Sequence, residues 1–299
     1  ATTVTSVTVT KAFVGWSDGT STYKQGSAYL MGVNSVVFTA QWVTVFTLHY
    51  SAMGGVGAPA DVSYNDGSYA DISSTQPTRT GYSFDHWIDQ TGATVSACSN
   101  QCYKIDSTHY LLYAVWTATP YNVTYNSAGG SSVSGTTKTF GQIYNLSNVV
   151  PTKTGYTFAG WSDTALVYGA QAAYTMPAND VTFTAQWTAN IYHVTYDLNG
   201  GTSSAITQAD TAYQGTFTVS PTVPTKSGYT FTRWAVGATN YDSNAAFTMP
   251  ASDVTFIAQW GVSSYAVTYD LNGGSSTPAI TQANVAFGST FTVSTTVPT

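Results

Sequence analysis

The chain has 299 residues, a formal net charge of −6 and only 7% charged residues. Its acidic residues are all aspartate, and its eight basic residues are scattered. Because neutralising phosphates requires clustered Lys and Arg, this balance argues against a nucleic-acid partner. No run of about 18 apolar residues could cross a membrane as a helix. The first residues lack the basic and apolar regions of a signal peptide, which predicts a mature chain or a fragment if the protein is exported.

The composition predicts a mainly β protein. Thr, Ser, Val, Tyr and Gly are abundant, whereas the strong helix formers Glu, Lys, Arg and Leu are scarce. With 43% hydrophobic and 14% aromatic residues, the chain has enough apolar surface for folded cores.

The tryptophans reveal internal repeats. All eight occupy two repeat positions, and the later position recurs every 71–74 residues, in step with four Gly-Gly pairs. The earlier series is Trp16, Trp87, Trp161 and Trp234, and the later series is Trp42, Trp116, Trp187 and Trp260. We expect all eight to form repeat cores, since a unit of about 72 residues has little other apolar volume.

The repeats divide the chain into five segments. The pattern predicts the C-terminal half of a repeat at 1–42, called here the N-terminal half repeat, and the N-terminal half of another at 261–299, the C-terminal half repeat. Between them lie the complete second (43–116), third (117–187) and fourth (188–260) repeats. Between Trp187 and Tyr192 only four residues intervene, without Gly or Pro, and such a short junction predicts a stiff, elongated string.

Strand signals dominate each copy. In the fourth repeat, Val254, Phe256, Ala258 and Trp260 alternate with other residues, as in a half-buried strand. The alternation places Trp234 opposite its aromatic neighbours, which either a bulge or burial on both faces would explain. Little helix is expected; a short helix or turn could fit residues 204–225.

Three motifs recur in the complete repeats: VTYDLNGG, PTKSGYTFTRW and FTMPASDVTFIAQW in the fourth, and VTYNSAGG, PTKTGYTFAGW and YTMPANDVTFTAQW in the third. Taken together, these motifs resemble the Listeria–Bacteroides repeat, also called the internalin B-repeat. The resemblance covers the whole chain. It implies small β-grasp-like domains in tandem arrays on surface or secreted proteins, where they act as stalks, spacers and sometimes adhesive modules. It carries no catalytic residues to transfer.

The second repeat departs most from the pattern, because an insertion between its tryptophans carries Cys98 and Cys102. A redox pair, a metal half-site or a nucleophile near His86 and His109 are the functional alternatives. A second pair of zinc ligands is not evident. A disulfide pinning an inserted hairpin in an oxidising compartment is the preferred interpretation.

Other candidate sites are weak. The turns at Asp197 and Asp270 each offer one carboxylate, far short of a calcium site, so they are read as turns. Arg79, Lys153 and Lys226 share one repeat position, either as a repeated ligand contact or as a solvated strand edge. Two sequons, at Asn122 and Asn145, are possible glycosylation sites. No metal, cofactor or catalytic set is predicted.

The sequence therefore predicts an extracellular or cell-surface structural protein forming a stiff stalk or filament, and not an enzyme. The two half repeats would together make one complete domain. Two explanations stay open: a fragment of a longer array, or a subunit that polymerises head to tail by completion of the half repeats. The alternative function is a surface adhesin that binds a host protein or glycan, with the second repeat as the candidate module.

Overall fold

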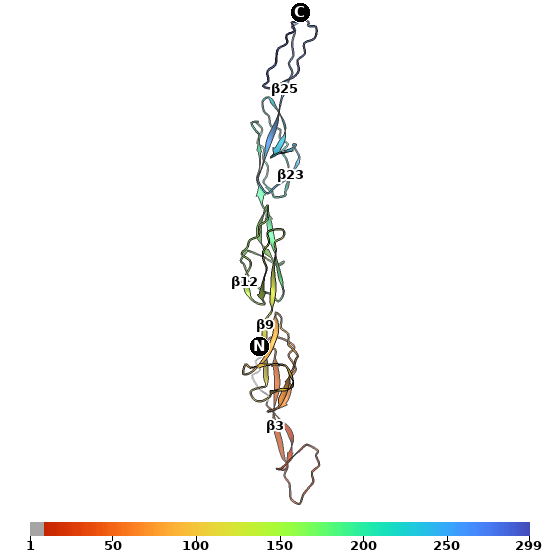
Figure 1. Ribbon diagram of the computed structural model, residues 1–299, viewed down its shortest axis with the longest axis vertical. Helices are drawn as coiled ribbons and strands as arrows, with labels where there is room; N and C mark the ends of the chain where they lie inside the picture. The colour runs from red at the N-terminus through yellow and green to blue at the C-terminus, as the bar shows by residue number, and fades with distance from the viewer. Residues whose placement is uncertain (1–8) are drawn as a thin grey trace. The chain divides into compact units, whose positions relative to one another are not determined.

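The computed structural model describes residues 9–299, and every regular element among them is a β-strand (Figure 1). The mainly β tandem array expected from the sequence is confirmed; the β-grasp topology and the repeat boundaries stay predictions. No helix in the described part of the chain is long and apolar enough to span a membrane. The chain divides into two compact units: unit 1 holds the residues up to Tyr125 with Ser134–Ser147 and Gln171–Phe183, and unit 2 holds the rest.

Unit 1 is built on one main sheet with the strand order β2-β1-β3-β9-β6-β7, and β4 pairs with β3 beside it. Strand β3 pairs antiparallel with β1 and parallel with β9. A separate pair, β5 and β8, faces this sheet across the buried core. The strands are β1 (Thr10–Ser17), β2 (Thr22–Tyr23), β3 (Thr39–Ser51), β4 (Val62–Asn65), β5 (Tyr69–Ile72), β6 (Tyr82–Asp89), β7 (Thr94–Val95), β8 (Cys98–Lys104) and β9 (Leu111–Ala118).

The third repeat contributes residues to both units. On the unit 1 side β10 pairs with β11, and β12 pairs with β15; on the unit 2 side β13 pairs with β14 and with the later residues of β16. The strands are β10 (Pro120–Asn126), β11 (Thr136–Thr139), β12 (Ile143–Asn145), β13 (Tyr156–Ser162), β14 (Val167–Tyr168), β15 (Ala173–Thr175) and β16 (Val181–Ala189).

The fourth repeat lies wholly in unit 2. Its main sheet has the order β18-β24-β21-β22, in which β18 runs parallel to β24, and the pair β20–β23 covers the core. The segment 204–225 contains β19 and β20, and no helix forms there. The strands are β17 (Ile191–Tyr192), β18 (Val194–Asp197), β19 (Thr211–Ala212), β20 (Thr216–Thr218), β21 (Tyr229–Val236), β22 (Thr239–Tyr241), β23 (Ala246–Thr248) and β24 (Val254–Val262); β25 (Ser264–Tyr265) and β26 (Val285–Ala286) follow in the C-terminal half repeat.

A β-bulge recurs just before the first tryptophan of each copy. In β21 the register against β24 shifts between Phe231 and Arg233. The extra residue turns Trp234 into the core, where it is fully buried, while Phe231 stays 5.1 Å from it. Of the two explanations for the broken alternation, the bulge is the one that the structure contains. Equivalent shifts occur at Phe13/Gly15, Phe84/His86 and Phe158/Gly160.

The connections between copies are of two kinds. From the N-terminal half repeat into the second repeat, β3 continues for 13 residues without a break. Between later copies a single residue interrupts the strand: Thr119 between β9 and β10, Asn190 between β16 and β17, and Ser263 between β24 and β25. The sequence accounts for this difference. Leu48 and Val123 occupy the same position in successive copies, but Leu48 comes six residues after Trp42 and Val123 comes seven after Trp116, so the first connection is one residue shorter.

Candidate interaction surfaces

The first tryptophan of each complete repeat is a core residue. Trp87, Trp161 and Trp234 are 2%, 0% and 0% exposed. In the fourth repeat, Tyr196 from the first half of the repeat lies edge-on to Trp234 at 4.9 Å and stacks on Phe256 at 5.1 Å. The hydroxyl of Tyr196 accepts a hydrogen bond from the backbone N–H of Ser220 at 2.9 Å. The core of a repeat therefore requires side chains from both of its halves.

The second tryptophan of each complete repeat holds the Gly-Gly turn of the first half. The indole N–H of Trp260 donates to the carbonyl of Leu198 at 3.2 Å, across 62 residues of sequence. Trp116 and Trp187 make the same bond to Ala52 and Ser127 at 2.9 and 3.0 Å. Each of these carbonyls also accepts a backbone N–H within its own turn, as Leu198 does from Gly201 at 3.0 Å, so the indole adds a second, long-range donor that ties the turn to the final strand.

The repeated basic residue belongs to the same arrangement. Lys226 donates to the carbonyl of Asn199 at 2.9 Å, and its ammonium lies 4.9 Å from the Tyr229 ring and 5.7 Å from the Trp260 ring. Lys153 repeats these contacts, and Arg79 lies 4.1 Å from the ring of Tyr82. This position therefore caps a turn and packs on aromatic faces, a role that neither sequence-based interpretation included. Only the tyrosine is close in sequence; Asn199 and Trp260 lie 27 and 34 residues from Lys226, so the local pattern could not reveal the whole arrangement.

The described part of the N-terminal half repeat exposes the equivalent aromatic face. Trp16 is 42% exposed and Trp42 58% exposed, in contrast with their buried or half-buried counterparts in the complete repeats. Phe13 packs edge-on against both, at 5.3 and 5.6 Å. A hollow of about 270 Å³ is lined by Trp16, Tyr23, Lys24, Gly26, Ser27, Tyr29 and Phe38.

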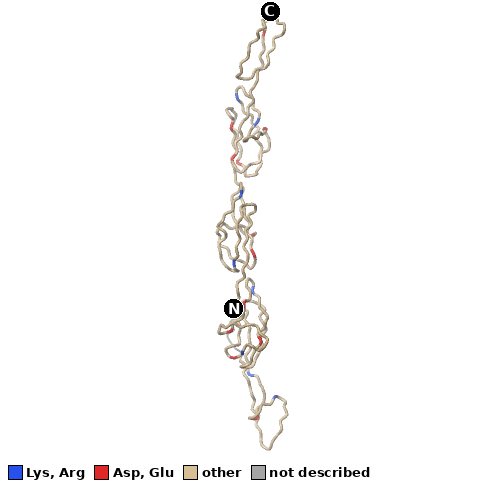
Figure 2. Tube along the Cα trace, in the orientation of Figure 1, with Lys and Arg blue, Asp and Glu red and all other residues tan. Residues whose placement is uncertain are grey.

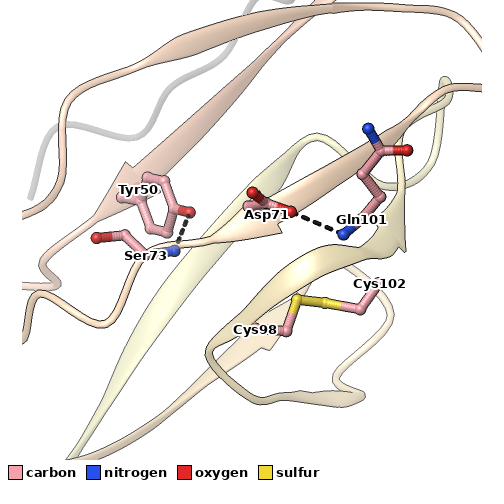
Figure 3. The surroundings of a disulfide bond; sticks show 6 residues. All are labelled: Tyr50, Asp71, Ser73, Cys98, Gln101 and Cys102. Carbon is pink, nitrogen blue, oxygen red and sulfur yellow. Dashed lines mark hydrogen bonds between the residues drawn. A yellow bond between two sulfur atoms is a disulfide. The ribbon is translucent and has the colours of Figure 1, made fainter.

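Strand β8 of the second repeat pairs with β5 as β23 pairs with β20, but it is longer, and a disulfide joins Cys98 to Cys102 within it (Figure 3). Between the cysteines, the backbone N–H of Gln101 donates to Asp71 of β5 at 2.7 Å, so the turn is fastened to the neighbouring strand. A groove of about 710 Å³ lies beside this turn. Its lining includes Leu48, Tyr50, Val62, Tyr64, Asp71 and Cys98.

One carboxylate near the insertion is buried. Asp89 is 4% exposed, and its Oδ1 accepts hydrogen bonds from Thr91 and from the backbone N–H of Ala93. Burial opposes ionisation, but these hydrogen bonds outweigh it and lower the pKa of Asp89. His109 lies 4.0 Å from Asp89 and hydrogen-bonds Asp106 at 2.8 Å. The carboxylate thus organises a turn, as short-range Asp side chains commonly do.

The turns at Asp197 and Asp270 are built in the same way. Each carboxylate accepts the backbone N–H two residues later, at 2.8 and 2.9 Å, from Asn199 and Asn272. Among residues 9–299, no group of three or more metal-ligating side chains comes together. Asn122 and Asn145 are both exposed on strands β10 and β12. Whether these sequons carry glycans stays a prediction.

Charged residues are sparse over the described chain. Figure 2 shows Lys, Arg and Asp placed singly or in small groups along a trace that is otherwise uncharged. Exposed ion pairs are few, and the shortest joins His193 to Asp210 at 2.7 Å. Recognition at these surfaces would therefore rest on aromatic faces and backbone edges more than on charge.

These features define a tandem-repeat protein whose copies are small all-strand units, each closed by two tryptophans. The model of the Listeria–Bacteroides repeat domain matches residues 46–115, 121–186 and 192–259, more than half of the chain. The chain belongs to the Listeria–Bacteroides repeat family, which confirms the resemblance seen in its motifs. Each match falls inside one of the three predicted complete repeats.

Relatives share these repeats as parts of longer chains. A protein of Evansella cellulosilytica named "Putative Gly-rich membrane protein" is 29% identical over 276 residues, which cover 88% of this chain and 30% of the relative. A second protein of that organism, "Putative membrane protein", is 30% identical over 85% of this chain and 38% of its own length. Internalin H of Listeria monocytogenes is 42% identical over 116 residues, covering 37% of this chain and 20% of internalin H. The chain thus spans less than two fifths of each relative.

Proposed function

We propose that this chain is a structural repeat segment of the cell envelope, exposed outside the cell as part of a stiff stalk or filament, without enzymatic activity. The observation that carries the proposal is the single-residue connection between successive closed cores. At Asn190, for example, the N–H donates to Gly155 and the carbonyl accepts from Tyr213, so the linking residue has both backbone groups bonded. Such a connection leaves little freedom for neighbouring copies to move independently.

The family and the relatives support the location. Repeats of this family occur here in tandem, and the relatives include proteins named as membrane proteins and as an internalin. A surface stalk must keep its length outside the cell, where disulfides such as Cys98–Cys102 persist. Aspartate-only acidity and few Lys residues give such a stalk a weakly charged surface.

Electron microscopy of the 299-residue chain, together with antibody labelling of intact cells, tests this proposal. We expect thin particles of uniform length, and labelling that is lost when intact cells are shaved with protease. Particles that bend sharply at every junction would contradict the stiff array. Labelling that appears only after cell lysis would contradict the location.

At a finer level, we propose that the exposed aromatic face of the N-terminal half repeat binds residues 261–299 of a second copy. Two observations support this. Residues 265–274 match 192–201 closely, including Tyr269 at the position of Tyr196. In the fourth repeat it is this matching segment that covers Trp234 and Phe256, the counterparts of Trp16 and Phe38. A second copy would thus supply to Trp16 the contacts that Trp234 receives within one chain.

Sedimentation of the full chain over a range of concentrations tests the pairing. We expect the mass to rise with concentration, and Trp16→Asp to abolish the rise. Val33→Asp is the matched control, because Val33 lies in the same half repeat but is fully exposed. A monomer at every concentration would contradict pairing between copies. Equal loss with Val33→Asp would show a non-specific effect of charge.

A binding module is the second candidate, favoured by the groove beside the Cys98–Cys102 turn. Its lining combines Tyr50 and Tyr64 with Asp71, on the one repeat that carries an insertion. Aromatic faces with nearby polar groups suit a glycan or a peptide of a host protein. Screening the chain against glycans and host surface proteins tests this, with Tyr64→Ala as the variant that should lose binding. Binding retained by Tyr64→Ala would place the ligand elsewhere.

A further inference from the structure

Three of the connections between copies share one set of contacts. Between the third and fourth repeats, the N–H of Asn190 donates to the carbonyl of Gly155 at 2.9 Å, and the N–H of Tyr213 donates to the carbonyl of Asn190 at 2.8 Å. One linking residue is thus bonded to the repeat before it and to the repeat after it. The same chain of bonds runs through Gly81, Thr119 and Phe140 (2.9 and 2.9 Å) and through Gly228, Ser263 and Phe287 (3.0 and 2.8 Å).

The side chains at these connections also meet. The ring of Tyr213 lies directly against Gly155, whose φ is +76°, and a Cβ built on this glycine would fall on the ring. Tyr156, the next residue, holds Tyr213 edge-on at 5.4 Å, and the ammonium of Lys153 lies 4.6 Å from the Tyr156 ring. Glycine is required both by the positive φ and by the close approach of the aromatic ring. The rings of Phe140 and Phe287 lie against Gly81 and Gly228 in the same way.

The first connection, between the N-terminal half repeat and the second repeat, lacks the glycine, the interrupting linking residue and the aromatic ring. The positions of the glycine and the tyrosine hold Thr10 and Lys11, and the position of the aromatic ring holds Asp66. The linking residue itself is missing, and β3 runs straight through. Asp66 still donates its N–H to the strand, to Thr44 at 2.8 Å, but there is no glycine on which a ring could pack. The glycine and the aromatic residue therefore occur together or are absent together within this one chain.

We propose that the glycine, the linking residue and the aromatic residue of the next copy form an inter-repeat joint, an interaction surface whose partner is the following repeat. The joint makes the two repeats open cooperatively, because unfolding the second one removes the ring, exposes the glycine backbone and leaves the linking carbonyl unpaired. In a chain of small units, such nearest-neighbour contacts add to the intrinsic stability of each copy. At the first connection an unbroken strand replaces the joint.

Hydrogen exchange of the full chain, followed by mass spectrometry of peptides from each repeat, tests the joint. Tyr213→Ala should speed exchange about tenfold, both in the fourth repeat and in β13 of the third, which Tyr213 touches only through the joint. Tyr213→Phe should restore the wild-type pattern, since the other two joints carry Phe. Asp66→Ala is the matched change at the first connection and should leave exchange in β1 unaltered.

The glycine offers a second and independent variant. Gly155→Ala should speed exchange on both sides of the connection more than Gly141→Ala does. Gly141 has almost the same φ, +73°, but open space where a Cβ would lie, so it reports backbone strain alone. The joint is excluded if Tyr213→Ala changes exchange only within the fourth repeat. It is excluded also if the two glycine variants behave alike.

Discussion

The N-terminal half repeat and the fourth repeat share both tryptophans at matching positions and bury them differently. Trp16 corresponds to Trp234, and the two side chains are 42% and 0% exposed. Their own strands are alike, since both follow a β-bulge and both face the final strand of the copy. The difference lies in Tyr196 and its neighbours, which the first half of the fourth repeat adds to the core. The first half of a copy therefore contributes the side chains that bury the tryptophan of the second half.

The second tryptophan gives the same lesson. Trp260 is half-buried and bonded to Leu198, whereas Trp42 is 58% exposed. Corresponding tryptophans in nearly identical motifs, FTAQW and FIAQW, are thus expected to contribute differently to the stability of the two regions. The following changes break or sharpen this comparison, from the largest expected effect to the smallest.

Replacing the first tryptophan separates the two regions most clearly. Trp234→Ala should lower the free energy of unfolding of the fourth repeat by about 3–5 kcal/mol, because it leaves a large cavity in a closed core. Trp16→Ala should cost less than about 1 kcal/mol, since solvent already reaches that side chain. Exchange rates of amides in each segment measure both values. Equal losses of unfolding free energy for the two variants would show that the tryptophan stabilises its segment without the first half of the copy.

Trp260→Phe tests the turn. The phenylalanine keeps most of the apolar surface but removes the indole donor, so the Leu198 carbonyl keeps only the N–H of Gly201, at a cost of about 1–1.5 kcal/mol. Trp42→Phe, the matched change in the N-terminal half repeat, should be close to neutral. Chemical denaturation followed by exchange at residues 198–202 gives the local value. A neutral Trp260→Phe would show that the turn does not depend on the indole.

Tyr196→Phe removes only the hydroxyl that accepts the N–H of Ser220. We expect a loss of about 0.5–1.5 kcal/mol in the fourth repeat, as for a single buried hydrogen bond. The matched change is Tyr269→Phe in the C-terminal half repeat, where the hydroxyl accepts the N–H of Ser294 at 2.8 Å. Similar losses would show that this tie forms within the first half of a copy, without help from the second half.

The smallest effect concerns pH. The hydrogen bond and charge of Asp210 raise the pKa of His193 above its ordinary value of 6.5. The pair therefore stabilises the fourth repeat fully below about pH 6.5, and this contribution is lost as the pH rises through the raised pKa. The C-terminal half repeat has Ala266 at this position and should show no such dependence. NMR titration of His193 measures the pKa, and Asp210→Asn should return it toward 6.5; an unchanged value would remove Asp210 as the cause.

Much of the fold could be predicted from particular residues. The spacing of the tryptophans defined the copies, and the alternation from Val254 to Trp260 indicated the final strand, which β24 contains. The sequence could not distinguish a bulge before Trp234 from burial of the strand on both faces, because either one breaks the alternation of apolar and polar residues in the same way. The role of Lys226 was missed, since its partners, Asn199 and Trp260, are 27 and 34 positions away. The sequence has one residue fewer after Trp42 than after the later tryptophans. This difference could be interpreted only when the structure showed that β3 continues through the first connection without a break.

The sequence by itself determined the all-strand class, the repeat length and the positions of the turns. These follow from local chemistry, because alternating apolar residues and Asn-Gly turns act within a few positions of the chain. Only the tertiary structure decided which tryptophans are buried, what the repeated lysines bind and how one copy is connected to the next. Those properties depend on contacts between residues that lie about 20 to 65 positions apart, and identical motifs acquire different roles when the partner segment differs.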